Sequence, residues 1–85
     1  YSLFLQFEKN QITDLSLNDN EIIKIEENSF NEMSNLRQIN LTNNRLKYLS
    51  SELFNSQIET LEILEINLNR LYHVNDKLFN KLKGL

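Results

Sequence analysis

One asparagine recurs along this 85-residue chain at a nearly constant interval. Asn20, Asn44 and Asn69 lie 24 and then 25 residues apart, and each follows a short segment in which apolar and polar residues alternate. Self-similarity at a period of this length is typical of arrays in which each unit stacks on its neighbours. A compact helix-plus-strand domain would not require a constant spacing. The repeat therefore constrains the fold more than any other feature of the sequence.

Apolar positions recur in phase with these asparagines in three consecutive units, and a phenylalanine keeps its place in each. Only the second unit has an extra residue, which we place within 55–57. The alignment predicts units at residues 12–35, 36–60 and 61–84, with Leu85 opening a further unit and residues 1–11 forming a capping strand or the end of a preceding unit. The aligned apolar residues are Ile12, Leu15, Leu17, Ile22, Ile25, Phe30 and Met33; Leu36, Ile39, Leu41, Leu46, Leu49, Phe54 and Ile58; and Leu61, Leu64, Ile66, Leu71, Val74, Phe79 and Leu82.

Each alternating segment predicts a short strand with its leucine or isoleucine pointing inward. The asparagine that follows carries an amide that can donate and accept hydrogen bonds at once. We predict that it bonds the loop backbone of its own turn and of the next, because unpaired buried backbone groups would cost about 1–3 kcal/mol each. Asparagine would then turn a chain that has one glycine and no proline. In the second half of the first unit, Ser29 and Glu32 have the spacing of a capping box, which predicts a short helix.

The pattern LxxLxLxxNxLxxLxxxxFxxLxxL, clearest in ENSFNEMSNLRQINLTNNRL (residues 27–46), resembles the leucine-rich repeat. Its length and phenylalanine are similar to the typical subclass of Toll-type receptors and secreted animal proteins. The resemblance covers residues 12–85. It implies an α/β solenoid with a short parallel sheet on the concave face, loops with short helices or 3-10 turns on the convex face, and partner binding on the concave face. The chain departs from extracellular members in having no cysteine for end caps.

Strand positions between and beside the inward residues form the predicted binding surface. Ile63 and Leu68 break its polar pattern, and the alternation should turn both outward. Such an exposed apolar pair marks a contact site more often than a single exposed leucine does, the alternative being that both pack under a loop or a neighbouring unit. The predicted partner-binding residues are Asp14, Ser16, Asn18, Gln38, Asn40, Thr42, Ile63, Glu65, Asn67 and Leu68.

Asn40-Leu41-Thr42 is an N-glycosylation sequon. Asn40 should point from the middle strand into the concave face, where a glycan would exclude a flat protein partner. The alternative is that the sequon arises by chance in an asparagine-rich chain.

Composition argues against several classes of function. Nine basic and twelve acidic residues give a net charge of −3, which disfavours a nucleic-acid interface because such an interface needs clustered basic residues. The apolar runs are far shorter than the roughly 18 residues that cross a bilayer, so we expect no direct membrane contact, and YSLFLQFEKN lacks the basic leader of a signal peptide. The only histidine is His73 and the only glycine is Gly84, so we predict no catalytic, cofactor or metal site.

The sequence therefore predicts a protein–protein recognition module, favoured as part of an extracellular or cell-surface protein by the resemblance. The alternative is a segment of an intracellular scaffold or adaptor. Three strands about 4.8 Å apart offer roughly 200–250 Å² of sheet, whereas a standard interface buries about 800 Å² per partner. We therefore expect a longer array, or stacking on another copy.

Overall fold

A computed structural model describes residues 9–72 and 84. The elements in chain order are the 3-10 turn η2 (Lys9–Gln11), the strands β1 (Asp14–Ser16) and β2 (Gln38–Asn40), the 3-10 turn η3 (Asn55–Gln57) and the strand β3 (Ile63–Glu65). The strands form one parallel sheet in the order β1-β2-β3, which confirms the predicted short parallel sheet.

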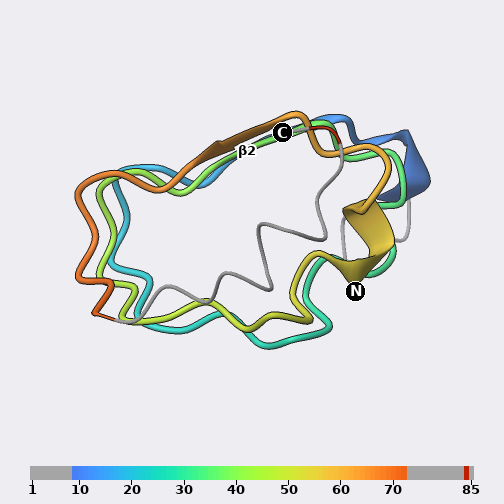
Figure 1. The fold of residues 1–85 in the computed structure, drawn as a ribbon. Helices are drawn as coiled ribbons and strands as arrows, with labels where there is room; N and C mark the ends of the chain where they lie inside the picture. The colour runs from blue at the N-terminus through green and yellow to red at the C-terminus, as the bar shows by residue number, and fades with distance from the viewer. Residues whose placement is uncertain (1–8, 73–83, 85) are drawn as a thin grey trace, which may run out of the picture.

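The strands are paired without any shift in register. Leu15 lies opposite Ile39, and Ile39 lies opposite Leu64, so the aligned positions of the three units are also neighbours in space. Parallel strands require a crossover between them. Figure 1 shows these crossovers as overlying circuits of the chain, with the strands along one long side and the returning segments along the other.

The predicted capping box at Ser29 and Glu32 does not start a helix. Residues 27–32 and 34–35 form turns, and within the described residues the only helical elements are the two 3-10 turns. A single turn gains few backbone hydrogen bonds for the residues that it fixes, so a capping pattern alone does not produce a helix.

The apolar core is centred on the second unit. Leu36, Ile39, Leu41 and Leu46 are completely buried, and Phe54 is 1% exposed. The aligned residues of the outer units only partly share this burial, because a unit is covered on both sides only in the middle of a stack. The partly buried apolar residues that pack against the core are Ile12, Leu15, Leu17, Ile22, Ile25, Leu64, Ile66 and Leu71.

Two of the predicted aligned phenylalanines stack on the side opposite the strands. The rings of Phe30 and Phe54 are nearly parallel, with an interplanar angle of 2° and centroids 5.9 Å apart. Such an arrangement contributes about 0.5–1.5 kcal/mol beyond the burial of the rings. The third phenylalanine of the alignment, Phe79, lies outside the described residues.

Gln57 corrects the sequence alignment, which pairs Met33 with Ile58. Gln57 is completely buried, whereas Ile58 is partly exposed, and Gln57 stands three residues after Phe54 just as Met33 stands three residues after Phe30. Its Nε2 donates to the carbonyl oxygens of Phe30 at 2.7 Å and Met33 at 2.8 Å. An apolar side chain could not make these two hydrogen bonds, which add to the backbone bonds that the same carbonyls accept from Met33 N and Leu36 N at 3.1 Å.

The extra residue of the second unit is therefore accommodated after Gln57 rather than within 55–57. In the first unit the N–H of Leu36 donates to Met33 O, three residues back, at 3.1 Å. In the second unit the N–H of Leu61 donates to Gln57 O, four residues back, at 2.9 Å. The turn is wider by one residue, and the next strand starts in register.

Replacing Gln57 with methionine should destabilise the chain. Methionine is similar in volume but has no donor, so two side-chain hydrogen bonds worth about 0.5–1.5 kcal/mol each would be lost, although both carbonyls keep their backbone hydrogen bonds. The buried Gln57 Oε1, which has no partner, would be removed as well, so we expect the free energy of unfolding to fall by about 1 kcal/mol. Urea denaturation measures the loss, with Ser56→Ala in the same 3-10 turn as the control. An unchanged or increased stability of Gln57→Met would contradict the assigned role.

Candidate functional site

The predicted asparagines link the loops at the ends of the strands. Asn44 is 5% exposed, and its Nδ2 donates to Leu41 O in its own turn at 2.9 Å and to Leu17 O in the preceding unit at 3.0 Å. Its Oδ1 accepts a hydrogen bond from Ile22 N of the preceding unit at 3.1 Å. One amide thus satisfies three backbone groups in two units.

Asn69 repeats this pattern one unit later. Its Nδ2 donates to Ile66 O and to Leu41 O, each at 2.9 Å, and its Oδ1 accepts from Leu46 N at 3.0 Å. Asn44 and Asn69 therefore bond their own turn and the preceding unit, whereas the sequence-based prediction is a bond to the next unit. Asn20 donates to Leu17 O and Asn18 O of its own turn.

The sharp bend occurs one residue before each of these asparagines. Asp19, Asn43 and Leu68 have φ angles of 59°, 60° and 57°, in the left-handed region. Aspartate and asparagine adopt this conformation readily, but a leucine there costs about 1–2 kcal/mol. Leu68 is also 73% exposed. The turn itself gives no reason for leucine at this position.

Replacing Leu68 with asparagine should therefore stabilise the fold, by about 1 kcal/mol. The reciprocal change, Asn43→Leu, should destabilise it by a similar amount or more, because it also removes the 3.0 Å hydrogen bond from Asn43 Nδ2 to Asp19 Oδ1. Chemical denaturation of both variants measures the two changes in the free energy of unfolding. A Leu68→Asn variant less stable than the parent would mean that the leucine is held by packing.

The predicted binding residues lie together on the outward face of the sheet and at its edge, which we call the sheet face. Successive rows across the units are Asp14, Gln38 and Ile63; Ser16, Asn40 and Glu65; and Asn18, Thr42 and Asn67, with Leu68 at the edge. Ile63 is 39% exposed and Leu68 is 73% exposed, so neither is packed under a loop.

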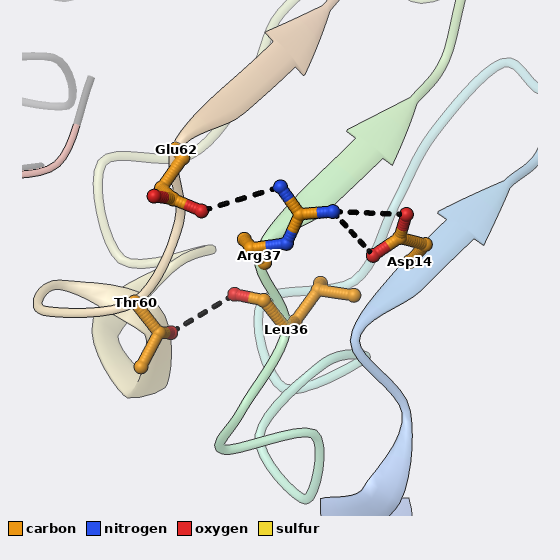
Figure 2. Close-up of polar contacts among 5 residues, drawn as sticks. All are labelled: Asp14, Leu36, Arg37, Thr60 and Glu62. Atoms are coloured by element: carbon orange, nitrogen blue, oxygen red, sulfur yellow. Dashed lines mark hydrogen bonds and ion pairs between the residues drawn. The ribbon is translucent and has the colours of Figure 1, made fainter.

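Charges at the start of the strands pair with one another. Arg37 lies between Asp14 and Glu62, with each ion pair at 3.4 Å and all three side chains about half exposed, as Figure 2 shows. Just below, Thr60 Oγ1 donates to Leu36 O at 2.9 Å. Exposed ion pairs of this kind are worth at most about 1 kcal/mol. The guanidinium of Arg37 is nevertheless already paired within the chain.

Asn40, the acceptor residue of the sequon, is half-buried on β2. Its Oδ1 accepts a hydrogen bond from Thr42 N at 3.0 Å, which turns the amide towards its own backbone. The hydroxyl of Thr42 is buried without a partner. Glycosylation of Asn40 stays a prediction.

Residues 9–72 and 84 contain no group of three or more His, Cys, Asp or Glu side chains placed to hold a metal ion. In the same part of the chain, none of the helical segments has the length and apolar character needed to span a bilayer. His73 lies outside the described residues.

Comparison with known proteins identifies the family. The model of the BspA type leucine rich repeat region, which comprises six copies, matches residues 5–85. The chain belongs to this leucine-rich repeat family. The predicted family is thereby confirmed, whereas the Toll-type subclass stays a prediction.

The curated relatives carry the same repeat in their names. Leucine-rich repeat-containing protein 3B of Bos taurus, Mus musculus and Homo sapiens is in each case 33% identical over 70 residues. The match covers 82% of this chain and 27% of each relative, so the chain spans about a quarter of their length. No solved structure matches the chain. Leucine-rich repeats are in general modules for protein–protein interaction rather than enzymes.

Proposed function

We propose that the chain recognises a protein partner through its sheet face. The observation that carries this proposal is the exposed pair Ile63 and Leu68, of which Leu68 also has an unfavourable left-handed backbone. Exposed apolar groups rimmed by polar residues are typical of interaction sites, and strained residues cluster at such sites. The surrounding polar side chains, among them Gln38 and Asn67, supply hydrogen-bonding groups for the rim.

The recognition surface belongs to a longer curved array, a solenoid, in this proposal. The sheet of three strands is about threefold smaller than one side of a standard protein interface. The inward side chains of the outer units, such as Leu15 and Leu64, are only partly buried, which leaves apolar surface for further units or another copy to cover. The greater length of the relatives is consistent with this arrangement.

We further infer an extracellular or cell-surface protein of the innate-immune or adhesion type, which rests on the resemblance to Toll-type arrays. The second candidate is an intracellular scaffold segment, which the complete absence of cysteine favours. In either setting the array has no catalytic role and binds protein.

Introducing charge at both anchors tests the sheet face. Ile63→Asp with Leu68→Asp should remove at least one binding partner of the full-length protein, because two carboxylates would replace the apolar contact area. Proximity labelling in the cells that express the protein, comparing parent and variant, measures this. Ser29→Asp with Ser34→Asp is the control, because it adds the same charge at exposed serines away from the sheet face and should leave the labelled proteins unchanged.

The melting temperature of the charged variant should stay within a few degrees of the parent, since both side chains are exposed. The same set of labelled proteins for parent and variant, with folding unchanged, would overturn the proposal.

The sequon gives an independent test of the same surface. A glycan on Asn40 would cover the middle strand, so binding through the sheet face predicts an unmodified Asn40. Intact-mass measurement of the protein from a secreting host, with Asn40→Gln as the reference, decides this. A glycan mass that disappears in Asn40→Gln would move the binding surface away from the sheet face.

A further inference from the structure

A second surface lies on the segments that follow the asparagines at the strand ends. The third residue after the asparagine is Ile23, Lys47 and Tyr72 in successive units, and Tyr48 follows Lys47. We call these four residues the flank patch. Tyr72 N donates to Lys47 O at 3.2 Å, and Arg45 N donates to Ile22 O at 2.8 Å, so the three segments are backbone neighbours. They overlie one another at the left end of Figure 1, opposite η3.

The flank patch concentrates exposed apolar surface. Five large apolar side chains of the described residues are exposed, and three of them belong to this patch: Ile23 at 60%, Tyr48 at 45% and Tyr72 at 75%. The residues just before Ile23 and Tyr72, which are Ile22 and Leu71, pack against the core, and the buried Leu46 and Leu49 flank Lys47 and Tyr48. The fold therefore does not need apolar residues at the exposed positions. Tyrosine is enriched at protein interfaces, where its ring packs and its hydroxyl bonds.

Lys47 lies in this apolar patch without an ion-pair partner among the described residues. Five ion pairs join other charged side chains of that part of the chain, and none involves Lys47. The carboxylates on the neighbouring turn are engaged elsewhere, since Glu26 lies 3.7 Å from Lys24 Nζ and Glu27 accepts from Ser50 Oγ at 3.1 Å. At this position the three units therefore carry an apolar residue (Ile23), a lysine with no ion-pair partner in the described part of the chain (Lys47) and an aromatic residue (Tyr72).

We propose that the flank patch docks a helical protein segment that carries a carboxylate between two apolar side chains. Successive units are about 4.8 Å apart, so the row from Ile23 to Tyr72 spans roughly 10 Å. Side chains three or four residues apart on one face of a helix are about 5–6 Å from each other. An acidic residue with apolar neighbours three or four positions away on both sides would therefore match Lys47, Ile23 and Tyr72. This contact is separate from the sheet face and does not depend on it.

A library of helical peptides with randomised surface positions, displayed on phage, tests the proposal. Selection uses the parent chain, and counter-selection uses Tyr48→Ser with Tyr72→Ser. We expect enriched peptides to carry Asp or Glu flanked by apolar residues three or four positions away. Their affinity should fall at least tenfold in the counter-selection variant.

Charge reversal at Lys47 then tests the pairing itself. Lys47→Glu should weaken the enriched acidic peptides at least tenfold, and peptides with Lys in place of the acid should prefer Lys47→Glu over the parent. Ile63→Asp with Leu68→Asp is the matched control and should leave peptide binding unchanged, so failure at the flank and failure at the sheet face are told apart. Circular dichroism and thermal melting verify that each variant is folded.

The proposal is overturned if no peptide family is enriched, if the enriched peptides lack an acidic residue, or if they bind Lys47→Glu as well as the parent. Vesicles of phosphatidylcholine with phosphatidylserine provide the remaining comparison. Retention of the parent but not of Tyr48→Ser with Tyr72→Ser on these vesicles would assign the patch to anionic lipid and would also overturn it.

Discussion

The asparagine amides that bridge neighbouring units are the interaction on which the rest of the structure depends. Leu41 O is buried at the end of β2 and accepts from Nδ2 of both Asn44 and Asn69, each at 2.9 Å. A buried carbonyl without a donor is costly, so the loops can stack only where an amide meets each of them. The amides thereby fix the distance between units. The inward leucines can then lie above one another, and the strands pair without a shift.

The spacing of the units and the register of the strands can be predicted from the sequence. The unit to which each asparagine bonds cannot. The 24- and 25-residue intervals and the alternation around Leu15, Ile39 and Leu64 are sufficient for a parallel sheet in register. Spacing does not tell whether Asn44 reaches the preceding or the next unit. The alignment also fails at Gln57, because it matches apolar residues with one another, whereas the buried residue at this position is an amide that donates to the carbonyls of Phe30 and Met33.

The sheet face can be placed from the sequence, whereas the flank patch cannot. Alternation has a definite direction within a strand, so the sequence alone is enough to place residues such as Asn40 and Glu65 on the sheet face. Ile23, Tyr48 and Tyr72 lie in the two-residue gaps between inward positions, where a period of two gives no direction, and Tyr48 stands one position later than the other two. The three-dimensional arrangement shows that these side chains are exposed on neighbouring segments, together with a lysine that has no ion-pair partner among the described residues.

Many polar side chains bond to the same position of a neighbouring unit, and two rows of such positions are interrupted. Along the edge of the sheet, Asn43 bonds Asp19 and Arg45 pairs with Glu21, so these polar groups are already used by the chain. Leu68 takes the position of Asp19 and Asn43 in the third unit, where its apolar side chain cannot form a hydrogen bond to Asn43. Lys47 has apolar residues at the same position in the units on either side, where carboxylates would stabilise it. An aspartate or asparagine at position 68, and carboxylates at positions 23 and 72, would complete both rows. We propose that both interruptions lie where the surface contacts a partner.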